Sequence, residues 1–241
     1  MTQPIVYTAC FGDHDQPEDS SAFGVAAELH CFTDNPNLID KLPHWNVHVR
    51  RRMFQTTRMD AKWYKMSARH LFPDRSWSIY IDSSVRVKDP LSMIQIVRQS
   101  LDVSIVRLMA LGVEGDLGGL AFFLHPEAQR SLEEEAQFSM TMPKYMGEPC
   151  VAQVAHYRAC GMNPDAVPDY HLYAGGVIGR DHTDSNELFE KAWFDECVHW
   201  SVQDQLSLPY VLWKERRTPG VIPGNIYDNE FLCRVWSGPG K

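Results

Sequence analysis

A short apolar segment that ends on a carboxylate is the first place in this sequence where chemistry could be positioned. Ser78–Ile81 is rich in β-branched and aromatic residues, which favour a buried strand, and Asp82 follows it directly. In an α/β sheet, the carboxyl ends of the strands form the edge at which ligands bind. A second extended segment, Val85–Lys88, comes next, and then a helix that begins at Pro90 with Asp89 as its cap. Asp82 could therefore either close a turn or belong to a site at this edge.

Basic residues precede this strand at helical spacing. They are Arg58, Lys62, Lys65 and Arg69. A helix over Gln55–Phe72 would place them on one face, because they are separated by four, three and four positions. Like charges at this spacing destabilise an isolated helix, and a bound diphosphate would offset the repulsion through charge-assisted hydrogen bonds. The alternative is a solvated basic face.

Two early strands end in polar turns. Ile5–Ala9 leads into the turn that contains Gly12, and Glu28–Phe32 leads into Thr33–Pro36. Neighbouring strand ends of an open α/β sheet form the crevice that receives a nucleotide, so polar groups here could bind a base or ribose. Ordinary turn chemistry explains either motif taken alone. Neither GxGxxG nor GxxxxGK[ST] occurs, so the sequence does not support a dinucleotide site or a P-loop.

Late in the chain, Asp204 and Gln205 fall in the first turn of a helix predicted over Gln203–Lys214. The helix dipole favours a carboxylate there, so capping alone would explain Asp204, whereas Gln205 has no structural role that we can name. His125 ends another strand just before a proline. It could be a packed core residue or a site residue.

Strands and helices alternate along the chain, which predicts an α/β fold with a mainly parallel, doubly wound sheet. The other predicted strands are Trp45–Val49, Asp102–Met109, Leu120–Leu124 and Leu172–Gly179. The other predicted helices are Glu127–Met140, Glu148–Cys160 and Ser185–Trp200. Gly175 and Gly176 lie inside a predicted strand, which indicates close approach by a ligand or another backbone. We expect one domain over residues 1–241, with a nucleotide-binding half at 5–90, a donor-sugar and acceptor half at 91–214, and a tail extended over the surface at 215–241.

Composition narrows the possible functions. The 241 residues are 44% hydrophobic, which is enough for one large α/β domain with a substantial core. A net charge of −8 provides no global attraction for nucleic acid or anionic membranes. No segment approaches the ~20 apolar residues of a membrane span, and the first residues lack the pattern of a signal peptide. The six cysteines lack zinc-site spacing and fit free thiols of a reducing compartment. We therefore expect a cytoplasmic protein.

Several segments, taken in order, resemble a known family. They are YTACFGDHD (Tyr7–Asp15), CFTDN (Cys31–Asn35), AKWYK (Ala61–Lys65), LFP (Leu71–Pro73), SIYID (Ser78–Asp82) and DQLS (Asp204–Ser207). This series resembles a family of nucleotide-sugar glycosyltransferases of bacteria and plants, and more remotely glycogenin and the retaining bacterial galactosyltransferases. The resemblance covers roughly Ile5–Leu212. It implies a Rossmann-like glycosyltransferase fold of the A type.

The resemblance also implies roles for the donor-binding residues. The base and ribose pocket would be formed by Thr8, Ala9, Phe11 and Asp13, with Asp34 and Asn35 nearby. Lys62 and Lys65 would hold the diphosphate. The remaining donor-side candidates are Arg58, Ser83, Gly175 and Gly176.

By the same resemblance, Asp82 would hold a divalent metal ion, Mn²⁺ or Mg²⁺, that bridges the two phosphates. Asp204 and Gln205 would face the transferred sugar as the catalytic pair. This chain has Ser84 where related enzymes often have the second aspartate of Asp-x-Asp, and a hydroxyl is a poorer ligand for a hard cation than a carboxylate. With Asp82 and Ser84 as the metal ligands, we therefore expect weak metal affinity.

These residues predict a glycosyltransferase that moves a sugar from a nucleoside-diphosphate donor, with UDP as the expected nucleotide, to a hydroxyl group of a carbohydrate, a lipid or a protein glycan. Because no separate general base stands out, we expect retention of configuration. His125 and His182 are candidates on the acceptor side.

Two alternatives stay open. Arg50–Arg52 and Lys214–Arg217 are basic clusters that could grip phosphates if the acceptor is a hydroxylated base in DNA. A non-catalytic domain that binds nucleotide sugars would need the same donor residues without turnover. A hydrolase is not supported, because the sequence has no nucleophile elbow.

Overall fold

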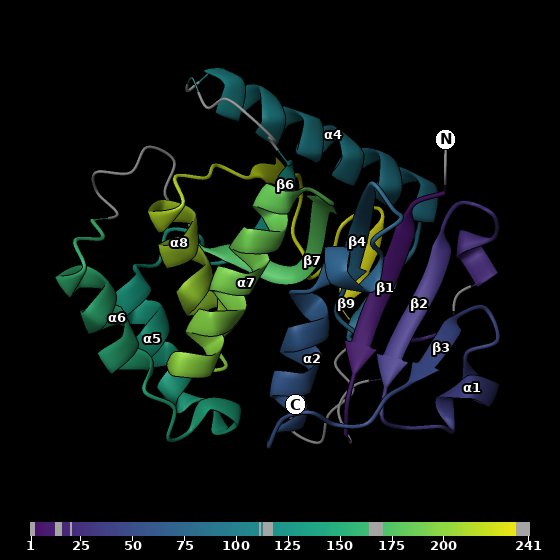
Figure 1. Cartoon of the computed structure of the whole chain (residues 1–241), viewed down its shortest axis with the longest axis horizontal. Helices are drawn as coiled ribbons and strands as arrows, with labels where there is room; N and C mark the ends of the chain where they lie inside the picture. Colours follow the sequence, from purple (N-terminus) through teal and green to yellow (C-terminus); the bar gives the residue numbers. More distant parts are fainter. Residues whose placement is uncertain are drawn as a thin grey trace.

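A seven-stranded sheet forms the centre of the protein in the computed structural model, which describes residues 3–12, 16–19, 21–110, 112, 118–163 and 171–234 (Figure 1). Its strands are β1 (Ile5–Cys10), β2 (Glu28–Thr33), β3 (Asn46–Val49), β4 (Trp77–Ile81), β6 (Leu120–Leu124), β7 (Tyr173–Asp181) and β8 (Gly220–Ile222). They lie in the order β3-β2-β1-β4-β7-β6-β8. β7 runs antiparallel to its neighbours β4 and β6, and the other neighbouring pairs are parallel. The predicted α/β class and mainly parallel, Rossmann-like sheet are confirmed.

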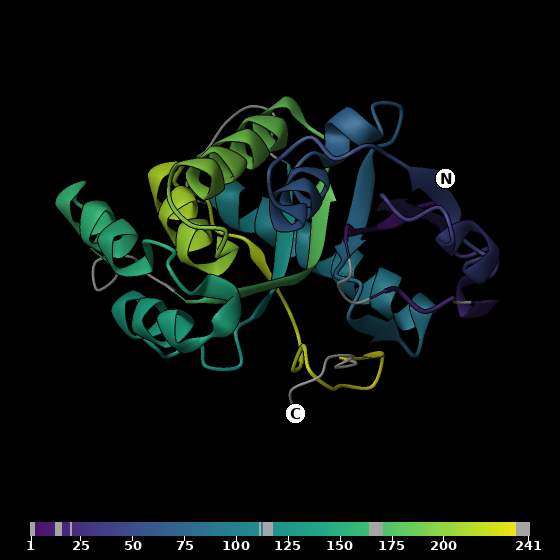
Figure 2. The ribbon, with the colours of Figure 1, turned by 90° about the horizontal axis from the view of Figure 1, so that it is seen from below.

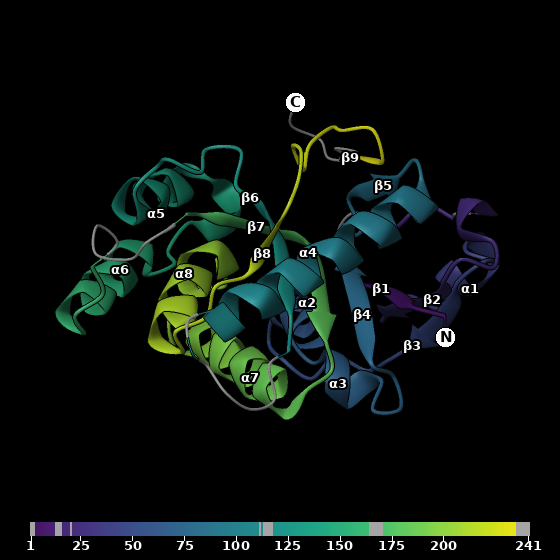
Figure 3. The ribbon, with the colours of Figure 1, turned by 90° about the horizontal axis from the view of Figure 1, so that it is seen from above.

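Helices cover both faces of this sheet. One face is covered by α4 (Pro90–Ala110), which crosses the strands in Figures 1 and 3. The helices on the other face are α2 (Thr57–Lys65), α3 (Ala68–Leu71), α7 (Asp184–His199) and α8 (Asp204–Lys214). Beyond α8 lie α5 (Leu132–Thr141) and α6 (Cys150–Ala159), which pack on each other and on α8 (Figure 2). A short helix, α1 (Leu38–Lys41), connects β2 to β3.

The central strands are apolar on both faces because helices cover both. In β1, Tyr7 and Ala9 pack in the core beneath α2, whereas Val6 and Cys10 pack in the core on the α4 side. All six residues of β1 are buried. Near-continuous apolar strands of this kind are typical of sheets covered on both sides.

The segment Asp102–Met109, which we predicted as a strand, is instead the second half of α4. Its β-branched residues favoured a strand. The buried residues Leu101, Ser104 and Leu108 recur at intervals of three and four, which is the period of a helix. The helix that begins at Pro90 therefore continues to Ala110.

Two other predicted helices have different boundaries. The helix predicted over Gln55–Phe72 is divided into α2 and α3, because the N–H of Met66 donates to the carbonyl groups of the last turn of α2 and closes it. α5 begins five residues later than predicted, since Ser131 and Glu134 form a capping box at its start.

The tail contributes to the core instead of only covering the surface. β8 is an edge strand of the main sheet, and β9 (Leu232–Arg234) pairs with β5 (Val85–Val87) in a separate two-stranded sheet. Ile222 and Leu232 are both 0% exposed. The described part of the tail is therefore a structural element of the fold.

No helix among the described residues is long and apolar enough to cross a membrane.

Candidate active site

The carboxyl ends of β1, β2, β4 and β6 meet at one edge of the sheet, because these strands point in the same direction. The strand order reverses between β1 and β4, so this is the topological switch point where open α/β sheets bind ligands. Asp34 follows β2, Asp82 follows β4 and His125 follows β6. The sequence motifs that we singled out at strand ends therefore converge on one edge, which we call the site edge.

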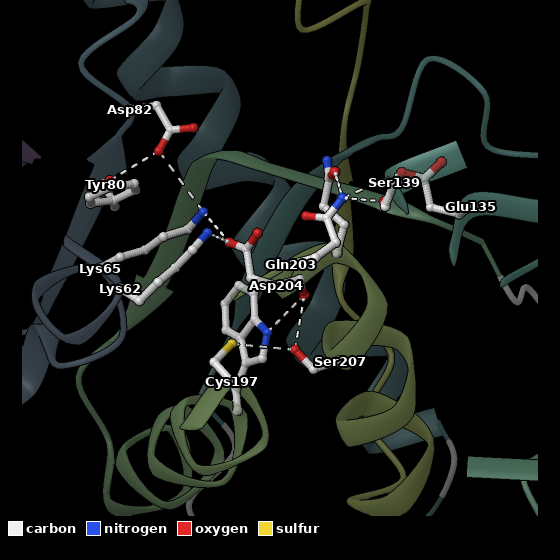
Figure 4. Close-up of polar contacts among 12 residues, drawn as sticks. Lys62, Lys65, Tyr80, Asp82, Glu135, Ser139, Cys197, Gln203, Asp204 and Ser207 are labelled. Atoms are coloured by element: carbon white, nitrogen blue, oxygen red, sulfur yellow. Dashed lines mark hydrogen bonds and ion pairs between the residues drawn. The ribbon is translucent and has the colours of Figure 1, made fainter. Parts of the chain in front are cut away.

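At the site edge, Asp204 forms an ion-paired cluster with two lysines (Figure 4). Lys62 Nζ lies 2.7 Å and Lys65 Nζ 2.5 Å from the same atom, Asp204 Oδ2. Lys65 Nζ also lies 3.9 Å from Asp82 Oδ1. Lys65 is thus placed between two carboxylates that come from β4 and α8. We refer to Lys62, Lys65, Asp82 and Asp204 as the charged cluster.

Ion pairing keeps the buried members of this cluster charged. Burial acts to raise the pKa of Asp204, but the charges of Lys62 and Lys65 outweigh it and hold that pKa well below its ordinary value. Burial acts to lower the pKa of Lys65, but Asp204 and Asp82 outweigh it and the pKa is raised. Asp204 is therefore a carboxylate and Lys65 an ammonium at neutral pH.

Two helices position the cluster. Lys62 and Lys65 occupy the last turn of α2, and Asp204 is the first residue of α8. The carbonyl group of Asp204 accepts hydrogen bonds from Trp193 Nε1 at 3.1 Å and from Ser207 Oγ at 3.2 Å. Gln203 and not Asp204 occupies the cap position of α8, and the carboxylate of Asp204 faces the lysines. Helix capping therefore does not explain Asp204.

Gly175 and Gly176 make room for this cluster. A Cβ atom at Gly175 would lie 2.8 Å from Lys65 Nζ and 3.3 Å from Asp204 Oδ2. A Cβ atom at Gly176 would lie 2.9 Å from Ile226 Cδ1. The close approach that we expected at these glycines is thus made by side chains of the protein itself.

Asp82 is the more open of the two carboxylates, with 34% of its side chain exposed. Tyr80 donates a hydrogen bond to Asp82 Oδ1 at 3.0 Å, and the N–H of Asp82 donates to the carbonyl group of Gly176 at 2.8 Å. Ser83 is half-buried, and Ser84 is buried at 7% exposure. Asp82 therefore faces the site edge with one oxygen already oriented.

The groups around Asp82 fit a divalent cation only if a substrate supplies further ligands. The described residues contain no group of three or more His, Cys, Asp or Glu side chains that could hold a metal ion. Asp82 alone, with an ammonium at 3.9 Å, does not form a protein cage. Mg²⁺, however, is commonly bound by one or two carboxylates together with substrate phosphates and water. The site therefore fits a cation that is bound together with a diphosphate.

The residues expected to line the base pocket are mostly packed in the core. Ala9 and Phe11 are 4% and 1% exposed, and Phe11 stacks on Tyr64 of α2 with ring centroids 5.1 Å apart. Thr8 is fully buried, and its Oγ1 has no hydrogen-bond partner among the described residues. Asp13 lies outside the described residues. The side chains of Ala9 and Phe11 thus support α2 instead of facing the site edge.

The turns after β1 and β2 are joined to each other. The N–H of Gly12 donates to Asp34 Oδ1 at 2.8 Å, and Gly12 has a positive φ of 72° that favours glycine. Asn35 Oδ1 accepts a hydrogen bond from the N–H of Asn37 at 3.0 Å. Asp34 and Asn35 therefore hold their turns at the site edge in the conformation seen here.

The four basic residues predicted to share one helix face over Gln55–Phe72 do not point to one place in the structure. Arg58 donates to the carbonyl group of Lys144, and Arg69 pairs with Asp184 on α7. Only Lys62 and Lys65 of the four reach Asp204. Arg69 is separated from them by the turn between α2 and α3, and Arg58, at the start of α2, is directed to Lys144 instead.

A second polar group lies beside Asp204 and was not predicted from the sequence. Gln203 Nε2 lies 3.1 Å from Ser139 Oγ, 3.4 Å from Gln205 Oε1 and 3.5 Å from Glu135 Oε1 (Figure 4). The network connects Gln205, a candidate for sugar binding, to α5. Only the position of Gln203 next to Asp204 in the chain could have pointed to it.

The two candidate histidines lie at opposite edges of the sheet. His125 is at the site edge, where its Nδ1 accepts from the N–H of Glu127 at 3.2 Å, and burial lowers its pKa. His182 follows the end of β7, which runs antiparallel, and contacts Ser78 Oγ at 2.8 Å near the start of β4. The structure therefore does not bring His182 to the site.

His182 instead makes stability depend on pH. Burial lowers its pKa to about 4, and Arg180 acts in the same direction. The unfolded chain, with a pKa of about 6.5, binds more protons between these values, so the free energy of unfolding falls as pH falls through this range. Between pH 7 and pH 4, the free energy of unfolding should therefore fall by about 3 kcal/mol more in the wild type than in His182→Gln. Urea unfolding at both pH values tests this. The exposed His70→Gln is the control, and equal pH dependence in wild type and His182→Gln would contradict the assignment.

The chain has an α/β sheet with a charged cluster at its switch point, and its family follows from comparison with known proteins. The family described as TOD1/MUCI70, glycosyltransferase-like domain, matches residues 35–230. The chain belongs to this family, so the glycosyltransferase class predicted from the sequence segments is confirmed. No curated protein matches the chain significantly.

Proposed function

We propose that the site edge binds a nucleoside-diphosphate sugar, with UDP as the nucleotide, and transfers the sugar to a hydroxyl group of an acceptor. The observation that carries this proposal is the charged cluster at the switch point, in which Lys62 and Lys65 both pair with Asp204 and Lys65 also lies near Asp82. Such a cluster offers cations to a departing diphosphate and a carboxylate to a sugar ring.

The chemistry follows from the charges. Glycosidic bond cleavage passes through an oxocarbenium-like transition state, with positive charge on the sugar and negative charge on the leaving group. Lys62 and Lys65 would stabilise the diphosphate that leaves. Asp204, with Gln205 beside it, would face the sugar and stabilise its positive charge.

We also propose retention of configuration at the transferred sugar. Inversion needs a general base that takes the acceptor proton, and a good base has a pKa near the working pH. The pKa of Asp204 is held well below its ordinary value by two lysines. Asp204 is therefore a poor base and a good electrostatic partner, which favours retention.

A divalent cation, Mn²⁺ or Mg²⁺, would be held by Asp82 together with the diphosphate and would supply positive charge to the leaving group. Ser84 is buried at 7% exposure, which makes it a poor candidate for a second ligand. Asp82, fixed by Tyr80, is the residue on which this part of the proposal depends.

The two basic clusters favour a carbohydrate, lipid or glycan acceptor over DNA. Arg50–Arg52 is exposed and follows β3 at the site edge. Lys214–Arg217 lies between the end of α8 and the start of β8, at the opposite edge, and Arg217 there contacts Ser185 and Asn186. Because the clusters lie at opposite edges, they do not form one phosphate-binding surface beside the site.

Ligand-dependent stability tests the proposed donor. A ligand that binds the folded state alone stabilises it by RT ln(1 + [L]/Kd), which is about 2.7 kcal/mol at 100 Kd. UDP with Mn²⁺ should therefore raise the melting temperature more than NAD or ATP does. If no nucleoside diphosphate raises it at saturating concentration, the proposal is wrong. Hydrolysis or transfer of a UDP-sugar, measured on the same protein, separates an enzyme from a non-catalytic binding domain.

A further inference from the structure

The charged cluster has no net charge to offer an anion in the state described. Its two ammonium groups and two carboxylates balance, and both ammonium groups are directed to one oxygen, Asp204 Oδ2. A diphosphate that enters this site would compete with Asp204 for the same lysines. The cluster can therefore attract a diphosphate strongly only if one of the ion pairs with Asp204 breaks.

The two lysines differ in how firmly they are held. Lys65 is 3% exposed, and its Nζ lies 5.5 Å from the ring centroid of Tyr80 and 5.9 Å from that of Trp193. It also faces both Asp82 and Asp204. Moving Lys65 would break several favourable interactions of a buried charge at once.

Lys62 is held by fewer contacts. Its side chain is 17% exposed, and Asp204 is its one ion-pair partner among the described residues. A lysine side chain has a flexible chain of four carbons and a strongly hydrated ammonium group. It can therefore turn towards an anion on its exposed side at a low cost in free energy. If Lys62 leaves, Asp204 keeps the ion pair with Lys65.

We propose that Lys62 exchanges partners, leaving Asp204 for the diphosphate when the donor binds, while Lys65 stays with Asp204. The exchange rests on the proposed function, because it requires a diphosphate donor. It has two consequences. The diphosphate gains a cation, and Asp204 loses one of its two neutralising neighbours, so its negative charge acts more strongly on the sugar. Lys62 thus couples donor binding to the strength with which the charge of Asp204 acts on the sugar.

Titration calorimetry with UDP and with uridine tests the exchange. Asp204→Asn removes the competitor for Lys62, so it should bind UDP about tenfold more tightly than wild type, at the low end of couplings measured between close charges. Uridine has no phosphate, and its affinity should not change. In a Lys62→Met background, Asp204→Asn should change UDP affinity by less than about threefold, because the exchanging cation is absent.

The outcomes separate this inference from the proposed function. If the wild type binds neither UDP nor another nucleoside diphosphate, both fail. If it binds UDP and Asp204→Asn binds UDP no more tightly, the exchange alone is overturned.

A second measurement works even if Asp204→Asn does not fold. In NMR spectra of ¹⁵N-labelled lysine ammonium groups, assigned with Lys62→Met, UDP should shift the Lys62 signal and leave that of Lys65 nearly unmoved. A Lys62 signal that does not respond to saturating UDP, or a larger response of Lys65, would refute the exchange.

Discussion

Asp204→Asn should turn over at least about 100-fold more slowly than the wild type, the scale typical of losing one preorganised electrostatic contact at a reacting centre. Asparagine has nearly the same shape but carries no charge, and in our proposal the charge of Asp204 is needed only when positive charge develops on the sugar. The loss should therefore appear in kcat, whereas UDP affinity rises.

A purely structural role for Asp204 makes a different forecast. Lys65 is 3% exposed and would lose its closest carboxylate, so the variant should be less stable than the wild type in either case. Turnover must therefore be expressed per folded molecule, with the melting temperature measured on the same sample. Asp195→Asn, whose carboxylate pairs with Lys191 on the surface of α7, is the matched control. Normal turnover per folded molecule in Asp204→Asn would remove Asp204 from the mechanism.

Lys65→Met should lower the free energy of unfolding by about 3 kcal/mol, at the low end of the cost of breaking a buried ion pair by removing one partner. The substitution keeps the length of the side chain but leaves Asp204 paired with Lys62 alone and Asp82 without its nearby ammonium. Lys62→Met should cost clearly less, because Asp204 would keep the more deeply buried partner.

Urea unfolding of the two variants measures this difference directly. Lys191→Met, at an exposed position of α7, provides the baseline for losing a surface lysine. The order of costs should be Lys65, then Lys62, then Lys191. If Lys65→Met is no more destabilising than Lys191→Met, the ion pairs described here do not hold α2 to α8.

Much of the architecture could be predicted from local patterns. The apolar runs that form β1, β4 and β6 were visible in the sequence because buried strands have few polar residues and end at turns. The second half of α4 was not predicted as a helix, because Val103, Ile105 and Val106 favour a strand. Its helical period extends across Asp102, where we placed the start of that strand. Local propensity cannot decide such a case; packing against the sheet does.

The site could be predicted as a set of residues but not as a set of partners. Lys62, Lys65, Asp82 and Asp204 were all identified, yet Lys65 and Asp204 are 139 residues apart in the chain. Their pairing depends on how α8 packs on α7 and β7, because α2 also packs on α7. The basic helical face looked like a binding site for an external anion because Asp60 is the only carboxylate between Arg58 and Arg69. Its closest anion in the structure is internal.

The small sheet formed by β5 and β9 has a consequence for how the site is assembled during folding. Val85, three residues after Asp82, pairs with Arg234, so two segments that are far apart in the sequence must meet before this part of the edge is complete. Loop-closure entropy makes such distant contacts slow to form, and they commonly follow the local ones. Ile226, which borders Gly176 beside Asp82, arrives with the same C-terminal segment. During synthesis, α2 and Asp82 are made well before Ile226 and β9, so the donor site that we propose is complete only after residues 226–234 have joined the fold.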